Sequence, residues 1–355
     1  MFRNNSNLIS RRRVWSAKYG MGPSSATGTG TLTLVNPVSY SNFQRNGSGY
    51  GDISISGTYT GTPGAVEASY NGGSYNTIQT EPTGGNFSGI LYGQAAAQGT
   101  LSVRWVGNPG SVVTRTLVGG GDTFVIGGQS NAVGMTAGNQ SYSHASLKAL
   151  MFANDYNWKE LTDPVDIGTN QVDTVSDDTS PGMGGSCWPP LATLFLASQN
   201  VPIAFVPCAK QDTSSAQWQP GANHFDRTTL FGSMLYRAQL TKAKAILWWQ
   251  GESDCVNAVN LDTFQTNLTT IVSTVWSELG IPMMLCRLED LAEVYEGFDE
   301  APYNARINAV ISGTTGALAG PSGFDFNDLH YSSTQAVNDV APAWWAAMQT
   351  AWGYS

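Results

Sequence analysis

One serine in this chain stands where a nucleophile for acyl transfer would be placed. Residues 122–134 have the sequence Asp-Thr-Phe-Val-Ile-Gly-Gly-Gln-Ser-Asn-Ala-Val-Gly, an apolar run that ends in two glycines just before Gln129 and Ser130. This pattern predicts a buried strand, and open α/β folds bind their ligands where such strands end. A serine hydroxyl is a weak nucleophile until a base takes its proton, so Ser130 requires a histidine within hydrogen-bond reach.

Three histidines are available as that base. His144 lies in a polar loop, and we expect it to be a surface residue. His224 precedes a predicted helix and is a candidate substrate contact. His330 follows an Asp-containing loop and precedes the carboxyl-terminal helix. We predict that His330 is the base.

A third segment completes a pattern. Residues 245–254 have the sequence Ala-Ile-Leu-Trp-Trp-Gln-Gly-Glu-Ser-Asp. With Gly-Gln-Ser-Asn at 128–131 before it and His330 after it, this segment resembles the SGNH hydrolases, most closely their sialate O-acetylesterase and acetylxylan esterase branch. The resemblance spans about residues 120–352. It implies a flavodoxin-like three-layer α/β fold with a parallel sheet, and a serine esterase that removes acetyl groups from a carbohydrate through an acetyl-enzyme.

Attack on an ester carbonyl builds negative charge on oxygen, which needs hydrogen-bond donors aimed at it. We expect the backbone N–H of Ser130 to be the first donor. The resemblance implies Gly185, at the start of a predicted helix, as the second donor. It implies the side-chain amide of Gln250 as the third, because Ser253 occupies the position where most SGNH enzymes have an asparagine.

The group that orients His330 is open, since the family places an aspartate three residues before the histidine and this chain has Asn327 there. Asn327 could orient the ring through its amide. A local shift could instead bring Asp328 into place. A backbone carbonyl could also suffice, which would leave a Ser-His dyad. Asp328 as a turn residue ahead of the last helix is an equal alternative.

Four side chains near these motifs are candidate substrate contacts: Gln129, Glu252, Lys210 and Trp218. Lys210 could attract a carboxylate such as that of sialic acid, or be a solvated lysine. Trp218 could stack on a sugar ring or cover the core. Glu252 and Asp254 also suggest a glycosidase pair, but one short loop rarely separates two carboxylates by the required distance of roughly 5 to 9.5 Å.

Other catalytic signatures are missing. Ala132 breaks the Gly-x-Ser-x-Gly pattern of ordinary α/β-hydrolases, and the chain has no P-loop and no His-Glu-x-x-His. We therefore expect neither a metal nor an organic cofactor. The four cysteines form no Cys-x-x-Cys pair, so we expect buried thiols, with Cys208–Cys255 as an alternative disulfide.

The composition indicates two domains that must position these residues. We predict a segment at 1–24, a small all-β sandwich at 25–116 and an SGNH hydrolase domain at 121–355, with a glycine-rich hinge at 117–121. The sandwich strands are expected at 30–36, 52–60, 64–70, 86–92 and 99–106. The hydrolase strands are expected at 123–128, 202–207, 244–249 and 282–287, and its helices at 186–198, 227–242, 261–279 and 334–352.

Charge and hydropathy exclude some partners. Charged residues make up 12% of the 355 residues and the net charge is −9, so nucleic acid is not an expected partner. No window approaches the 18 or so apolar residues of a membrane span, so we expect a soluble protein. The amino terminus is basic but no apolar signal region follows it. We expect an extracellular or virion-associated protein.

The sandwich has three interpretations: carbohydrate binding, docking to a larger assembly, or a spacer. The main alternative to an esterase is a non-catalytic glycan-binding or phage virion structural protein that keeps the hydrolase fold. An esterase acting on lipids is disfavoured, because no amphipathic apolar helix suits a lipid surface.

Overall fold

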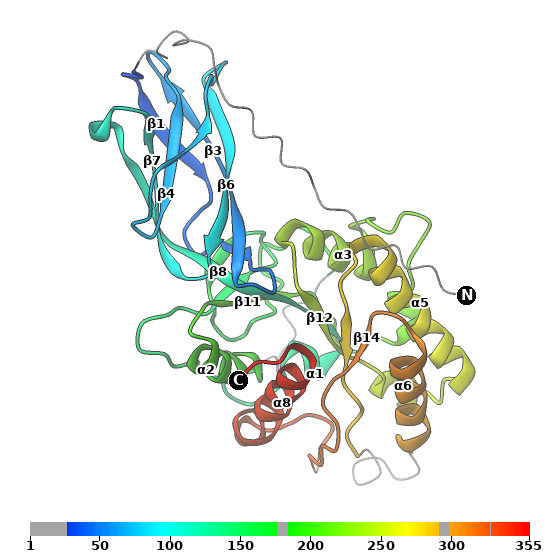
Figure 1. Cartoon of the computed structure of the whole chain (residues 1–355). Coiled ribbons are helices and arrows are strands. Elements are labelled where there is room, and N and C mark those ends of the chain that lie inside the picture. The colour runs from blue at the N-terminus through cyan, green and yellow to red at the C-terminus, as the bar shows by residue number, and fades with distance from the viewer. Residues whose placement is uncertain (1–26, 176–183, 291–298, 327) are drawn as a thin grey trace, which may run out of the picture.

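The computed structural model describes residues 27–175, 184–290, 299–326 and 328–355. A narrow β-sandwich forms one end of the molecule and a layered α/β unit forms the other, as Figure 1 shows. One long strand, β8 (Val113–Gly128), runs from the first into the second.

The sandwich consists of two sheets. The first contains β1 (Thr31–Asn36), β3 (Tyr50–Thr60) and β6 (Asn86–Ala95), paired antiparallel. The second contains β5 (Asn76–Gln79), β4 (Val66–Tyr70), β7 (Gln98–Trp105), the first half of β8 and β2 (Asn42–Gln44). Buried and exposed residues alternate along β1 and β3, because one face of each strand covers a core that includes Leu32, Ile53 and Trp105. The expected all-β unit is confirmed.

The α/β unit has a sheet in the order β10-β9-β11-β8-β12-β13-β14. Its strands are β9 (Leu150–Phe152), β10 (Trp158–Glu160), β11 (Ile203–Pro207), β12 (Ala245–Trp249), β13 (Met283–Leu285) and β14 (Ala317–Ala319). All neighbours are parallel except β10 and β9.

Helices cover both faces of this sheet. On one face lie α2 (Trp188–Gln199) and α8 (Ala341–Trp352), the latter preceded by α7 (Ser333–Gln335) and a π-helical turn, η3 (Ala336–Val340). On the other lie α3 (Leu230–Thr241), α5 (Leu261–Leu279) and α6 (Ala301–Gly313). Trp248 and Trp249 pack into opposite layers, as expected of neighbours on a strand. The predicted three-layer α/β fold is therefore confirmed.

The predicted hinge at 117–121 is wrong, because these residues lie inside β8 and pair with neighbouring strands. The glycines serve close packing instead. A Cβ atom at Gly120 would lie 2.2 Å from Cζ of Phe43, and one at Gly121 would lie 1.8 Å from the carbonyl oxygen of Pro202. The two units therefore share a continuous sheet, and the boundaries proposed for them stay a prediction.

Asp122 joins the two units electrostatically. Its fully buried carboxylate accepts hydrogen bonds from Arg45 Nη2 at 2.9 Å and Gln44 Nε2 at 2.9 Å, both in or after β2. Lys244 Nζ lies 3.1 Å away, and the Tyr354 hydroxyl also donates to it. Burial alone would raise the pKa of Asp122, but Arg45 and Lys244 outweigh it and hold that pKa below its usual value.

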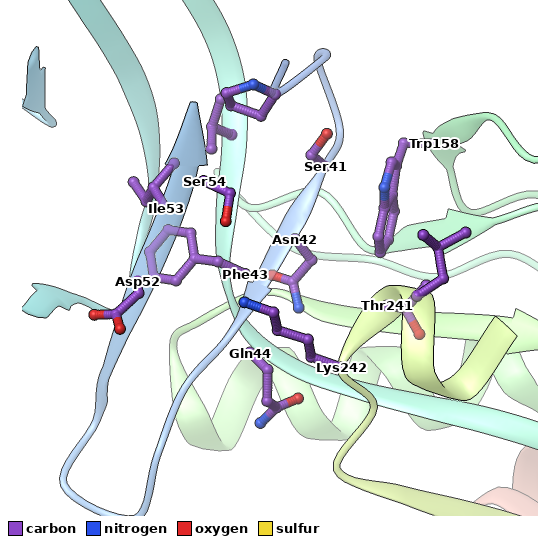
Figure 2. Close-up of a pocket in the computed structure, with 13 residues that line it drawn as sticks. Ser41, Asn42, Phe43, Gln44, Asp52, Ile53, Ser54, Trp158, Thr241 and Lys242 are labelled. Carbon is purple, nitrogen blue, oxygen red and sulfur yellow. The ribbon is translucent and has the colours of Figure 1, made fainter. Parts of the chain in front are cut away.

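A cavity of about 150 Å³ lies between the sandwich and the α/β unit. Figure 2 shows Asp52 and Ser54 of β3 on one side of it and Trp158 of β10 on the other, with Lys242 at the end of α3 reaching across Asn42. It is lined by no residue of the predicted catalytic site.

Two further expectations concern the cysteines and membrane spans. All four cysteines are buried and unpaired, as favoured from the sequence. Within the described part of the chain, every helix is too short or too polar to cross a bilayer.

Candidate active site

Ser130 begins a short helix, α1 (Ser130–Val133), directly after β8. The chain turns there at Gly128, which has a φ of 123°. A Cβ atom at Gly128 would lie 1.8 Å from the carbonyl oxygen of Trp249, so only glycine fits. The turn places Ser130 at the carboxyl edge of the sheet, as the sequence predicted.

His330 lies in a loop that is bonded to the nucleophile loop on both sides. The Asn131 side-chain amide donates to the Leu329 carbonyl at 3.2 Å, and the Tyr331 hydroxyl donates to the Asn131 carbonyl at 3.1 Å. Asn131 follows Ser130, while Leu329 and Tyr331 flank His330. These bonds hold the loop that carries the predicted base against the loop that carries the predicted nucleophile.

The imidazole of His330 is suited to act as a base. Its Nε2 atom is buried and has no hydrogen-bond partner among the residues that the structure describes. Burial lowers the pKa of His330, against the opposing charges of Asp328 and Asp212, so the ring is neutral at pH 7. Ser130 does not reach this nitrogen here, and such hydrogen bonds often tighten only when substrate binds.

The group that orients His330 stays a prediction. Asn327 lies outside the described residues. Asp328 is exposed, and its carboxylate accepts the N–H of Leu329 at 2.6 Å, a local turn contact. Asp212, in the loop after β11, also acts electrostatically on the ring, although nothing in the sequence singled it out. Its only sequence signal is its place after a predicted strand.

Two of the three predicted oxyanion donors are already engaged. The N–H of Gly185 donates to the Thr136 carbonyl at 3.2 Å. The Gln250 amide donates to Gln129 Oε1 at 2.8 Å and to the Thr213 carbonyl. Both residues would have to give up these bonds to serve an oxyanion. The Ser130 N–H, by contrast, opens a helix and has no intrahelical acceptor.

Gln129 offers a donor that sequence reasoning assigned only to substrate binding. Its Oε1 accepts hydrogen bonds from Gln250 Nε2 at 2.8 Å, from the Ser253 N–H at 3.1 Å and from the Gly251 N–H at 3.4 Å. Since these donors fix the oxygen, the amide nitrogen must face the other way. It donates to none of the described residues, and Gln129 directly precedes Ser130 in the chain.

Comparison with known proteins identifies the family. Residues 120–337 match the family model described as carbohydrate esterase, sialic acid-specific acetylesterase. The chain belongs to this carbohydrate esterase family. Membership implies an ester hydrolase and confirms the resemblance stated from the sequence.

Individual relatives and solved structures are similar to this chain. A probable carbohydrate esterase of Arabidopsis thaliana is 24% identical over 182 residues, which cover 45% of this chain and 65% of that relative's length. A carbohydrate acetylesterase from Xanthomonas citri has a similar fold, with 19% identity, a TM-score of 0.54 and coverage of 89% of this chain and 75% of the other. An Arabidopsis thaliana protein of known structure covers 64% of this chain and 98% of its own, with 18% identity and a TM-score of 0.47.

Two side chains predicted as substrate contacts are buried, and their role in substrate binding stays a prediction. Trp218 is 0% exposed, packs edge-on against Trp248 at 5.0 Å and donates its indole N–H to Thr213 Oγ1 at 2.9 Å, so it covers the core. Glu252 is 1% exposed and accepts a hydrogen bond from the amide of Asn131. Lys210 is half-buried at the end of β11, where its N–H donates to the carbonyl of Gly128 at 2.9 Å. Its role stays a prediction.

The remaining histidines lie in other contacts. His144 accepts backbone N–H groups of Ser146 and Leu147 in its own loop. His224 pairs with Glu278 at 2.8 Å, at the end of α5. Among the described residues, neither histidine is hydrogen-bonded to the loop that carries Ser130.

A buried acidic pair lies under the loop that carries Ser130. The Asn131 amide donates to Glu252 Oε1 at 3.0 Å and to Glu289 Oε1 at 3.1 Å. Burial raises the pKa of Glu252 to about 7. Burial, and then repulsion by Glu252, raises the pKa of Glu289 well above its usual value. Sequence reasoning missed Glu289, because a polar residue after a strand usually faces solvent.

Proposed function

We propose that this protein is a serine esterase that removes acetyl groups from a carbohydrate. The observation that carries the proposal is the pair of hydrogen bonds at Asn131, which hold the His330 loop against Ser130. The unpartnered Nε2 of His330 supports the role of base. Family membership supports the substrate class, an acetyl ester on a sugar.

The residues support a two-step reaction. His330 Nε2 takes the hydroxyl proton of Ser130 as Oγ bonds to the acetyl carbon. The C–O bond to the sugar then breaks, and His330 returns the proton to the departing sugar oxygen. Water attacks the acetyl-enzyme by the same route and acetate leaves with Ser130 restored. The Ser130 N–H and the free amide hydrogens of Gln129 are the donors for the oxyanion in both steps.

The test is acetate release from 4-nitrophenyl acetate and from a panel of acetylated glycans. Ser130→Ala and His330→Ala should each lower kcat on the order of 10⁴-fold or more, because either change removes the activated nucleophile. Ser277→Ala, with an exposed side chain away from the loop, is the matched control and should leave kcat unchanged.

The alternative, a glycan-binding or virion structural protein, predicts the opposite result. A native protein that binds an acetylated glycan but releases no acetate from any substrate would overturn the esterase proposal. A preference for long acyl chains over acetyl would point to a lipid substrate instead.

A further inference from the structure

Glu252 and Glu289 present two carboxyl groups to a single nitrogen atom. Glu252 begins α4 (Glu252–Val256) after β12, and Glu289 follows β13. Both are buried, at 1% and 0% exposure, and the Oε1 atom of each lies within 3.1 Å of Asn131 Nδ2. The two carboxyl groups are therefore close neighbours inside the protein.

No positive charge compensates this pair. Among the residues that the structure describes, neither glutamate has a salt bridge. The other titratable groups that face the pair are the carboxylate of Asp254 and the buried thiols of Cys255 and Cys286. Among the described residues the Oε2 atoms of both glutamates lack hydrogen-bond partners, while the indole of Trp249 and each glutamate's own backbone partly favour the charged form of the pair. Two adjacent buried carboxylates without a cation are costly, so a proton on one of them is the stable state.

The hydrogen count at Asn131 connects that proton to His330. The Asn131 amide has two hydrogens but three acceptors, the two Oε1 atoms and the Leu329 carbonyl at 3.2 Å. Ionised carboxylates are the stronger acceptors. Two of them would take both hydrogens and leave Leu329 unpaired. With one carboxyl protonated, a hydrogen remains for Leu329, the residue before His330.

We propose that Glu252 and Glu289 hold one proton between them and that this proton, acting through Asn131, keeps the His330 loop in register with Ser130. The glutamates are positioning residues, since neither touches the reacting atoms. Their effect on rate rests on the proposed esterase function, but the shared proton does not. Loss of the proton at alkaline pH should release the Leu329 anchor and lower kcat, with little change in KM.

Glutamine variants test the effect on rate. Glu252→Gln and Glu289→Gln each keep the shape of the pair and leave one carboxylate, so each should keep most of the neutral-pH kcat and lose the alkaline fall. Glu289→Ala leaves a cavity and should lower kcat about 100-fold at every pH, because small displacements of catalytic groups are costly. Glu67→Gln, on β4 of the sandwich, is the control and should keep the native profile. The proposal is overturned if both glutamine variants show the same fall in kcat at alkaline pH as the native protein.

Infrared spectroscopy tests the proton without relying on catalysis. The native protein near neutral pH should show the C=O stretch of a buried protonated carboxyl group, and subtraction of the Glu289→Gln spectrum should isolate it from other buried acids. Absence of that difference band overturns the shared proton even if the enzyme is active. Its presence in a protein that releases no acetate supports the shared proton and overturns the esterase proposal instead.

Discussion

Replacing Asp122 by alanine should weaken both halves of the molecule together. The substitution removes a carboxylate with 0% exposure and leaves Arg45 and Lys244 as neighbouring cations without their common partner. Removal of one member of a buried ion pair costs about 3–5 kcal/mol. We expect a loss of about 4 kcal/mol, a large part of the 5–15 kcal/mol that stabilises a typical domain. Urea unfolding of the native protein and the variant measures this difference.

The pH dependence makes the prediction sharper. Because the pKa of Asp122 is held below its ordinary value of 3.8, its stabilisation is present above that value and is lost as pH falls through the lower pKa of the folded state. The difference between native protein and variant should therefore be full at pH 7 and shrink in acid. Asp122→Asn, which keeps the size but not the charge, should show most of the loss. A difference below about 1 kcal/mol at pH 7, typical of surface pairs, would refute the reasoning, as would a difference that is constant down to acid pH.

Three further predictions concern packing, the oxyanion donor and the base. Gly120→Ala should lower the free energy of unfolding by about 1–3 kcal/mol through overpacking. Gly47 has open space around it, so Gly47→Ala should change that free energy little. Equal effects of the two substitutions in urea unfolding would argue against close packing at Gly120. Gln129→Leu should lower kcat about 10²-fold or more, as expected for an oxyanion donor. Gln250→Leu should have a smaller effect, since it only orients Gln129, and the reverse order in acetate release would favour Gln250 as the donor. Burial lowers the pKa of His330 from the ordinary histidine value of 6.5. The fall of kcat/KM at acid pH should therefore have its midpoint below pH 6.5, and a midpoint above 6.5 would contradict this.

Regular elements with strong local signals could be predicted from the sequence. The helix at 261–279 has the predicted bounds, because Asn260 caps its first turn and Gly280 ends it in a left-handed conformation. Strands with alternating residues were found within a few positions. The helix at 301–313 was missed, since its apolar positions contrast weakly with their neighbours.

Features that depend on tertiary contacts could not be predicted. Glycines at 119–121 suggest a hinge until the atoms packed against them are seen, such as the ring of Phe43 at Gly120. A tryptophan near a pocket motif suggests a sugar platform, and only packing against Trp248 shows that Trp218 lies in the core.

In the candidate site, too, local motifs could be predicted from the sequence and tertiary contacts could not. The predicted nucleophile and base were singled out by motif and lie on loops that meet. Which amide is free to donate depends on where each of its hydrogens points. A sequence does not encode that locally, so Gln129 and Gln250 could not be told apart.

The continuous strand β8 has a consequence for any attachment through the sandwich. Its sandwich half pairs with β7 up to Gly119, and Ser130 follows its other end. From Gly119 to the end of β8 at Gly128 the strand advances nine residues, or about 30 Å. Figure 1 shows the sandwich and α1 at opposite ends of this strand. A partner bound to the sandwich would therefore hold the candidate active site at a fixed distance from the attachment point. The separation is fixed because one continuous strand joins the two.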